Sequence, residues 1–339
     1  MVRVPLRQEG DDEMLGDILN PYHLQIVSFI LINIILGLSI YITLSSGQLS
    51  LGNAGFMGIG AYTSALLTIN FDLPIFLSII LGAVVAGVFG ILIGIPALRL
   101  TGVYLAIATL GFGEVIRVIF VNWESVTQGS IGLSGIPHLG RELFKMFTAI
   151  GFDPDMLGLK NNQFIYLLVV LILLLVNILL VWFFIRQNKS RVGRAYAAIK
   201  MDEKAAESMG INITYYKVLS FTQGAILAGF AGALYAHVMA YISPADFAYH
   251  RAIDILIFSI FGGSDLIWGA IFGATFMTIL PEALRFISEY RYMIYGVILI
   301  ILMAFRPQGI IDVPLLKWFK KTLRLTRGSN NGTGTKKHN

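Results

Sequence analysis

Two pairs of oppositely charged residues lie in segments of the chain that are otherwise apolar. Glu114 precedes Arg117 by three positions, and Arg251 precedes Asp254 by the same spacing. Residues three apart share one face of a helix, where opposite charges attract each other. An ionisable group inside a membrane is costly and usually functional, whereas long charged side chains near the membrane surface can reach water. The sequence leaves both roles open, and the closeness of all four residues to expected helix ends favours structural ion pairs.

The histidines and the common catalytic motifs do not indicate an enzyme. The five histidines lack metal-ligand spacing, a Gly-x-Ser-x-Gly elbow with suitable partners is missing, and there is no G-x-x-x-x-G-K-[ST] phosphate loop. Cysteine is absent too, which excludes disulfides and thiolate ligands. We therefore expect no catalytic residues and no metal site. We expect His237 to be a packed, hydrogen-bonded histidine.

A glycine-rich, nearly uncharged run from Ser45 to Tyr62 joins two apolar stretches. Glycine inside a helix is about 1 kcal/mol less favourable than alanine. Irregular or closely packed backbone at membrane depth occurs only where protein or a water-filled cavity surrounds it. The run is therefore expected to line a path or a tight helix junction. A second interrupted stretch, 262–273, contains Gly262, Gly263, Gly269 and Gly273. Paired interruptions of this kind point, by analogy with secondary transporters, to a transport site.

The elements that must position these residues follow from composition. Hydrophobic residues make up 56% of the 339 residues, charged residues only 13%, and the mean hydropathy is +0.75. A soluble domain carries roughly 25% charged residues. The sequence predicts an all-α, polytopic transmembrane helix bundle of about eight or nine spanning or partly spanning helices, some of them broken.

The candidate spans are apolar stretches close to the ~20 residues that cross a bilayer. They are 24–44, 48–69, 75–98, 102–121, 164–185, 216–240, 267–284 and 292–306. The stretch 251–262 is shorter and ends in two glycines, so we expect a half-helix or a re-entrant segment. The stretches 48–69 and 251–285 leave the number of full crossings open.

The distribution of lysine and arginine predicts the orientation. Both the loop 186–215 and the basic tail 313–339 are rich in these residues and should be cytoplasmic. The outer loop 122–163 has balanced charge and should face outward. A polar N-terminal segment, 1–23, precedes the transmembrane domain, 24–312, and resembles no secretory signal, so the first apolar stretch is expected to be retained as a span. The side on which the amino terminus lies stays open, and we expect the end of the tail to be disordered.

The cytoplasmic loop contains a short polar helix. Asp202–Met209 has acidic residues in its first turn and is followed by Gly210, a typical C-terminal cap. A short polar helix between two spans indicates a docking site, with an ordinary connecting loop as the alternative.

Two spans carry small residues at every fourth position. The two stripes are Gly82, Ala86, Gly90 and Gly94, and Gly224, Ala228, Gly232 and Ala236. Such stripes allow helix backbones to approach closely in a bilayer. Static packing is the favoured interpretation, and a moving interface is the alternative.

The short helix resembles a known docking element. Ala205, Ala206 and Gly210 have the spacing of the EAA loop through which ABC importer permeases contact their ATPases. Lys204 occupies the position at which that loop has its glutamate, and Glu203 lies one position earlier.

Further stretches are similar to the permease subunits of branched-chain amino-acid ABC importers, and to the longer of the two paired permeases. The resemblance covers about residues 25–312, nearly the whole membrane portion. The similar stretches are 46–56, 98–114, 127–137, 262–269 and 305–309.

The resemblance implies a mechanism and a set of partners. An extracytoplasmic substrate-binding protein delivers leucine, isoleucine or valine to the loop 122–163. This chain and a second permease subunit form the pathway through the lipid bilayer of the cytoplasmic membrane. Two cytoplasmic ATPase subunits bind the ATP, so this chain itself holds no cofactor, and no nucleic acid is involved. The implied ATPase-coupling residues are Glu203, Lys204, Ala205, Ala206 and Gly210, and the implied path residues are Gln48, Ser50, Asn53, Gly55, Glu114, Gly262 and Gly263.

Other functions stay open at this point. A permease of the same family could carry urea, amides or other amino acids. A secondary transporter coupled to an ion gradient would need carboxylates well inside the spans, and the sequence has few. An integral membrane enzyme would need a polar catalytic cluster, and none is evident.

Overall fold

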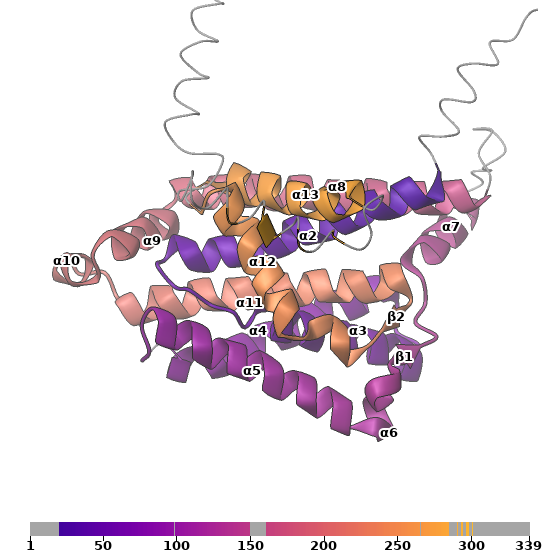
Figure 1. Cartoon of the computed structure of the whole chain (residues 1–339), viewed down its shortest axis with the longest axis horizontal. Helices are drawn as coiled ribbons and strands as arrows, with labels where there is room; N and C mark the ends of the chain where they lie inside the picture. The colour runs from indigo at the N-terminus through magenta and orange to yellow at the C-terminus, as the bar shows by residue number, and fades with distance from the viewer. Residues whose placement is uncertain are drawn as a thin grey trace, which may run out of the picture.

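Long apolar runs of the chain form long helices, as the sequence predicts. The computed structural model describes residues 20–97, 99–149, 161–264 and 266–284, together with 290, 293, 296–297 and 300. The larger helices are α2 (Pro21–Ser45), α3 (Asn53–Phe71), α4 (Ile75–Ala97), α5 (Val103–Asn122), α8 (Asn161–Lys189), α11 (Ile213–Met239), α12 (Tyr249–Gly262) and α13 (Ile267–Ala283). Most of them run along one common direction (Figure 1). The all-α class is thereby confirmed.

Short elements connect the long helices. They are α6 (Glu124–Thr127), the 3₁₀ helix η1 (Gly129–Ile131), β1 (Leu133–Ser134), α7 (Leu139–Ala149), α9 (Arg191–Met201), α10 (Glu203–Ser208), β2 (Tyr241–Ile242) and the 3₁₀ helix η3 (Pro244–Phe247). The two strands pair antiparallel, with Leu133 opposite Ile242. This small ribbon joins the segment after α5 to the segment after α11.

Within the described ranges, five helices are long and apolar enough to cross a membrane, and they are α2, α4, α5, α8 and α11. The predicted span 48–69 begins later, because α3 starts at Asn53 and residues 46–52 are not helical. The predicted short segment 251–262 is confirmed as α12, whose 14 residues extend roughly 21 Å. The predicted span 292–306 falls largely outside the described residues.

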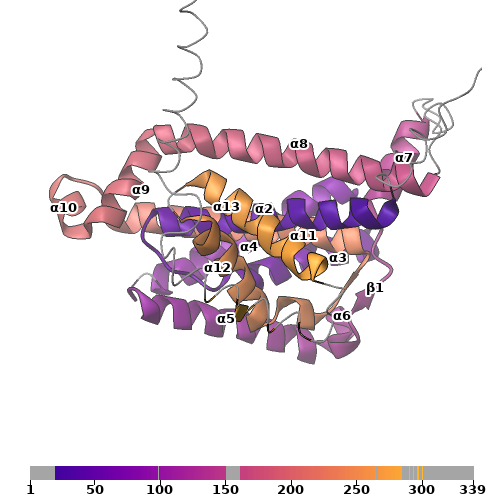
Figure 2. The same ribbon diagram turned by 45° about the horizontal axis from the view of Figure 1, so that its top comes forward.

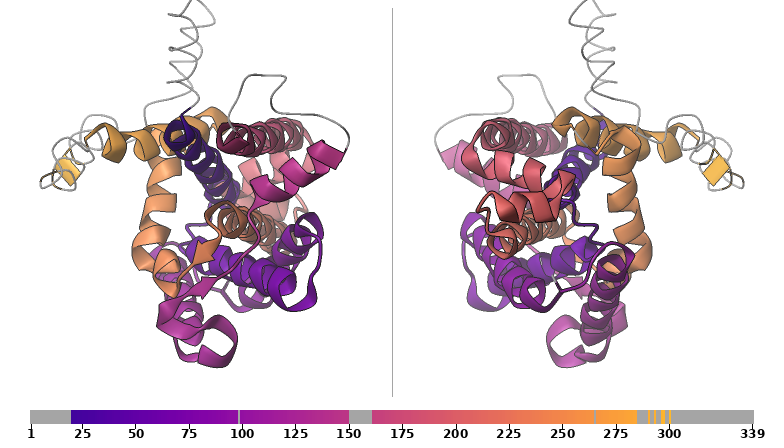
Figure 3. Two further views of the ribbon diagram at one scale, coloured as in Figure 1. Left: turned by 90° about the vertical axis from the view of Figure 1, so that its right-hand side faces the viewer. Right: turned by 90° about the vertical axis from the view of Figure 1, so that its left-hand side faces the viewer.

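Small residues hold the centre of the bundle together. Helix α11 lies in the middle, packed against α2, α3 and α4 (Figure 3). A Cβ added at Gly232 of α11 would lie 1.9 Å from the Met57 carbonyl oxygen of α3, and one added at Gly90 of α4 would lie 2.6 Å from the Ala225 Cβ of α11. Both predicted stripes therefore serve helix packing, because only small residues permit these approaches.

The bundle has two distinct ends. One end carries the pair α9 and α10, and the opposite end carries α6, α7 and the ribbon of β1 and β2 (Figures 1 and 2). We call them the α10 end and the ribbon end. Helix α2 starts at the ribbon end, and α8 runs from the ribbon end to the α10 end.

Candidate functional site

The break between α2 and α3 is a buried polar junction. The Gln48 side-chain amide donates to the Ser46 hydroxyl at 2.9 Å, the Ser220 hydroxyl at 2.9 Å and the Lys217 carbonyl at 3.0 Å. Its Oε1 atom is buried and has no hydrogen-bond partner among the described residues. The Gln48 side chain therefore connects the non-helical chain at this break to α11 by hydrogen bonds.

The other predicted path residues of the glycine-rich run complete the junction, and they are Ser50, Asn53 and Gly55. Asn53 donates to the Ser39 hydroxyl of α2 at 2.7 Å, and the Ser50 hydroxyl accepts the Gly52 N–H at 3.3 Å. A Cβ added at Gly55 would lie 2.8 Å from the Gly113 Cα of α5. The structure thus brings these predicted path residues together as a tight junction, and none of them lines the large pocket described below.

Glu114 joins α5 to the start of α12. Its Oε2 atom lies 2.7 Å from the Arg117 Nε, which confirms the predicted ion pair. Its Oε1 atom accepts the Tyr249 N–H at 2.7 Å. Tyr249 is the first residue of α12, whose own N-cap residue, Ala248, provides no side-chain cap. A carboxylate at a helix N-terminus is favourable, so Glu114 fixes where α12 begins.

Gly262 and Gly263 form the turn between α12 and α13. Gly263 has a φ of 115°, which a residue with a side chain rarely adopts. A Cβ added at Gly262 would lie 1.7 Å from the Gly269 carbonyl oxygen, and one added at Gly273 would lie 1.9 Å from the Phe258 carbonyl oxygen. These glycines make a closely packed helical hairpin possible.

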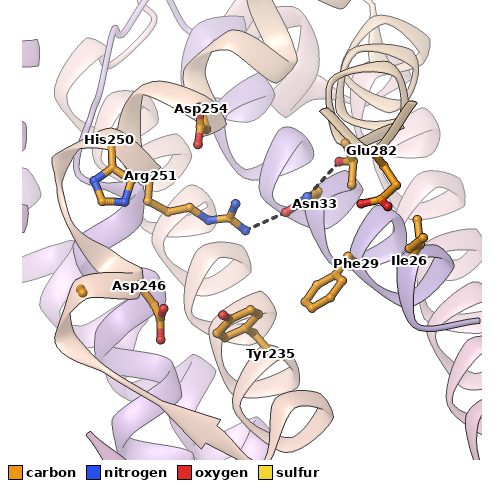
Figure 4. A pocket seen from close by; sticks show the side chains of 11 residues that line it. Ile26, Phe29, Asn33, Tyr235, Asp246, His250, Arg251, Asp254 and Glu282 are labelled. Carbon is orange, nitrogen blue, oxygen red and sulfur yellow. Dashed lines mark hydrogen bonds between the residues drawn. The ribbon is translucent and has the colours of Figure 1, made fainter. Parts of the chain in front are cut away.

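A pocket of about 570 Å³ lies between α2, α11, η3, α12 and α13 (Figure 4). Its lining residues are Ile26, Phe29, Asn33, Tyr235, Ala245, Asp246, His250, Arg251, Asp254, Thr278 and Glu282. At its edge, the Tyr22 hydroxyl donates to Glu282 and so joins α2 to α13.

The predicted ion pair between Arg251 and Asp254 is wrong. Arg251 extends across the pocket and donates to the Asn33 Oδ1 of α2 at 2.7 Å. Asn33 in turn donates to the Thr278 hydroxyl of α13 at 2.9 Å. The Arg251 side chain is long enough to reach α2. It bonds the Asn33 amide oxygen there, and not the Asp254 carboxylate one turn away on its own helix.

The α10 end carries the predicted short helix. Asp202 caps α10 by accepting the N–H groups of Lys204 at 2.9 Å and Ala205 at 3.0 Å. Ala206 is buried, whereas Lys204 and Ala205 are exposed. Gly210 follows with a φ of 80° and is exposed as well. The predicted helix over Asp202–Met209 is confirmed within one residue at each end.

An ion pair that the sequence analysis missed ties α10 to α11. The Lys217 Nζ atom lies 2.6 Å from the Glu203 Oε1 atom. Lys217 is buried and its carbonyl oxygen is an acceptor for Gln48, so one residue links α10 to the break between α2 and α3. A single lysine near the start of an otherwise apolar helix was the signal that could have revealed it.

Two methionines flank α10 and point into open space. Met201 is 88% exposed and Met209 is 83% exposed. Exposed flexible methionines are common on binding surfaces. Together with Lys204 and Ala205 they form what we call the α10 surface.

His237 has the structural role that the sequence predicts. It is fully buried, its Nε2 lies 2.9 Å from the Ser64 hydroxyl and its Nδ1 lies 2.9 Å from the Pro137 carbonyl oxygen. A carbonyl only accepts, so Nδ1 carries the proton and Nε2 accepts from Ser64. Over the ranges that the structure describes, no group of three or more metal-ligating side chains comes together.

Comparison with known proteins shows the family of the chain. Residues 22–303 match the family model described as the permease component of the branched-chain amino acid transport system. The chain belongs to this family. Its polar junction, its glycine hairpin and its exposed α10 are therefore features of a membrane permease subunit.

Individual relatives agree with this assignment. The permease is 35% identical to the high-affinity branched-chain amino acid transport system permease protein LivM of Escherichia coli, over 91% of this chain and 73% of the relative. It is 26% identical to LivH of Salmonella typhimurium, over 58% and 61%. It is 24% identical to the fructose import permease protein FrcC of Rhizobium meliloti, over 84% and 83%. No solved structure matches the chain.

Proposed function

We propose that this permease carries branched-chain amino acids across the cytoplasmic membrane as one subunit of an ATP-driven importer. The observation that carries the proposal is the family match over residues 22–303. The similarity to LivM extends over most of both chains, whereas the similarity to the fructose permease is weaker in identity. The substrate named for LivM is therefore the one we assign.

The α10 end is assigned to the cytoplasm. Basic residues gather there, at the end of α8 and along α9: Arg186, Lys189, Arg191, Arg194 and Lys200. Cytoplasmic loops of membrane proteins carry this excess. The Arg186 guanidinium lies 5.0 Å from the ring centroid of Trp182, an arrangement suited to the membrane surface. The ribbon end and the loop 122–163 then face outward, toward a substrate-binding protein.

The α10 surface is assigned to an ATPase subunit. Glu203, Lys204, Ala205, Ala206 and Gly210 lie on or beside a capped helix that projects from the bundle (Figure 2). The ion pair between Glu203 and Lys217 lets a force on α10 act on α11. ATP is bound by two such partner subunits, so this chain needs no nucleotide site of its own.

The path is assigned to the space bordered by the two helix breaks, shared with a second permease subunit. Gln48, Ser50, Asn53 and Gly55 shape the first break and Gly262 and Gly263 the second, while Glu114 fixes the start of α12. Breaks of this kind lie at membrane depth only where protein or a cavity surrounds them.

Reconstitution tests this function. The chain, its second permease and its ATPases are placed in proteoliposomes with the binding protein, and uptake of labelled leucine is measured with and without ATP. We expect accumulation that requires ATP and every subunit, and that excess isoleucine or valine suppresses. Accumulation without ATP would favour an ion-coupled transporter. Suppression by urea or acetamide, but not by valine, would reassign the substrate.

A further inference from the structure

We propose that the pocket between α2, α11, α12 and α13 is a transit site for an aliphatic α-amino acid, with the substrate carboxylate on Arg251 and its ammonium group beside Asp254 and Asp246. This assignment rests on the proposed function and adds to it a site on the permease itself. It also explains why charges of both signs line one pocket between these helices.

The anion half of the site is a half-buried arginine with unused donors. A guanidinium has five N–H donors, and Arg251 uses one of its nitrogens to reach Asn33. No carboxylate of the described chain lies within salt-bridge distance of Arg251. Arginine binds a carboxylate with two parallel hydrogen bonds, which makes it the suitable residue for the carboxyl group of an amino acid.

The cation half of the site consists of two aspartates. Figure 4 shows Asp254 and Asp246 on either side of the Arg251 side chain. Asp254 makes no hydrogen bond and no close ion pair in the described part of the chain, although the charges of Arg251 and His250 act on it, and Asp246 accepts the Ser243 N–H at 2.8 Å. A carboxylate held away from water without a hydrogen-bond donor is costly. A zwitterion supplies one partner of each sign at once, which an inorganic anion or a simple amine does not.

The remaining wall of the pocket is mixed, with apolar side chains beside the polar side chains of Asn33, Thr278 and Glu282. Ile26 and Phe29 of α2 lie across the pocket from the aspartates, and the Tyr235 ring lies below (Figure 4). An amino acid held by its charged end at Arg251 would direct a branched aliphatic side chain toward Ile26 and Phe29. The volume of about 570 Å³ is within the usual range of small-molecule sites.

The position of the pocket suits entry from outside. Arg251 lies in the first turn of α12, nearer the middle of the bundle, and Ile26 lies in the second turn of α2, which begins at the ribbon end. This is the end that the proposed orientation gives to the binding protein. The hydrogen bond of Arg251 to Asn33 connects the site to α2, and hence to the break that begins at Ser46.

Cysteine protection tests binding directly. The chain has no cysteine, so an introduced one is unique in it. Ala245→Cys, on the pocket lining, is labelled with a small methanethiosulfonate reagent in the purified membrane complex without the binding protein. We expect leucine to slow labelling, and leucinamide and isovalerate, which each lack one charged group, to have little effect. Ile131→Cys at the ribbon end, 81% exposed, is the control and should label at the same rate with or without leucine.

Charge variants test the assignment of each half. Arg251→Gln and Asp254→Asn should each lower leucine uptake about tenfold or more, because each loses a charge-assisted contact with the substrate. Both should also abolish the protection of Ala245→Cys. Arg251→Lys should restore part of the protection. Arg99→Gln removes an exposed charge from the turn between α4 and α5, away from the pocket, and should leave uptake unchanged.

Failure of this inference differs from failure of the proposed function. If the unaltered complex imports no branched-chain amino acid, the proposed function fails. If it imports leucine, and Arg251→Gln at normal membrane levels does so equally well, the transit site is wrong. If Arg251→Gln does not reach the membrane, the cysteine experiment decides: equal protection by leucine, leucinamide and isovalerate would overturn the assignment.

Discussion

The two helix breaks of this permease hold non-helical backbone in place in opposite ways. Between α2 and α3, the side-chain amide of Gln48 hydrogen-bonds Ser46, Ser220 and a carbonyl of α11. Between α12 and α13, glycines let backbone pack on backbone, and no side chain could fit at Gly262. The first break depends on polar contacts that can be exchanged, and the second depends on shape alone. We therefore expect the first to tolerate change better than the second.

The largest effect is expected at the glycine hairpin. Gly262→Ala should destabilise the protein by about 3 kcal/mol or more, because the added Cβ meets a backbone oxygen that cannot move away cheaply. Gly111→Ala is the matched control, since a Cβ there meets nothing within 4 Å. Thermal unfolding of the two purified variants measures the difference. Equal melting temperatures would show that the hairpin is not closely packed.

A smaller effect is expected at the polar junction. Gln48→Met keeps the volume but removes the donor to Ser46, Ser220 and the Lys217 carbonyl, which should cost about 1–3 kcal/mol. Gln25→Met on α2 is the control, because Gln25 has no side-chain hydrogen-bond partner among the residues described. The free energy of unfolding in detergent compares them. A loss as large as that of Gly262→Ala would remove the contrast between the breaks.

The link between the first break and α10 should affect coupling more than stability. Lys217→Met removes the ion pair with the half-exposed Glu203, an interaction worth roughly 1 kcal/mol. We expect fewer leucine molecules imported per ATP hydrolysed, at nearly normal ATPase activity. Arg99→Met, at an exposed position in the turn between α4 and α5, serves as the control. An unchanged ratio would mean that α10 transmits nothing through Lys217.

The smallest effect is a pH dependence at the ribbon end. Burial, and secondarily Arg141, lower the pKa of His138 below its usual value, and its Nδ1 accepts the Gly140 N–H at 3.0 Å. The folded protein therefore holds His138 neutral, while the unfolded chain binds a proton below about pH 6.5. Stability should fall slightly as the pH drops from 7 to 5.5. His138→Gln should reduce this slope of the melting temperature, and an identical slope would contradict the assignment.

Local patterns in the sequence predicted local structure well. The short helix over Asp202–Met209 and the packing stripes follow from caps and four-residue spacing, which depend on near neighbours. The Arg251–Asp254 prediction failed because the actual partner, Asn33, lies 218 positions away along the chain. The start of α3 was misplaced because Gln48 and its neighbours look compatible with an apolar helix until Ser220 is known to lie beside them. The spacing of residues along the sequence therefore could not reveal contacts between segments that are far apart in the chain.

We assign the α10 end to the cytoplasm and the ribbon end to the outside. The central claim of this assignment is that the α10 surface is a cytoplasmic docking site for an ATPase subunit. Met209→Cys, unique in a chain without cysteine, tests this most directly. In intact cells that express all subunits, we predict that it crosslinks to an ATPase subunit and resists a membrane-impermeant thiol reagent added outside. Labelling by that reagent from outside, or no crosslink to an ATPase in an importing complex, would contradict the account.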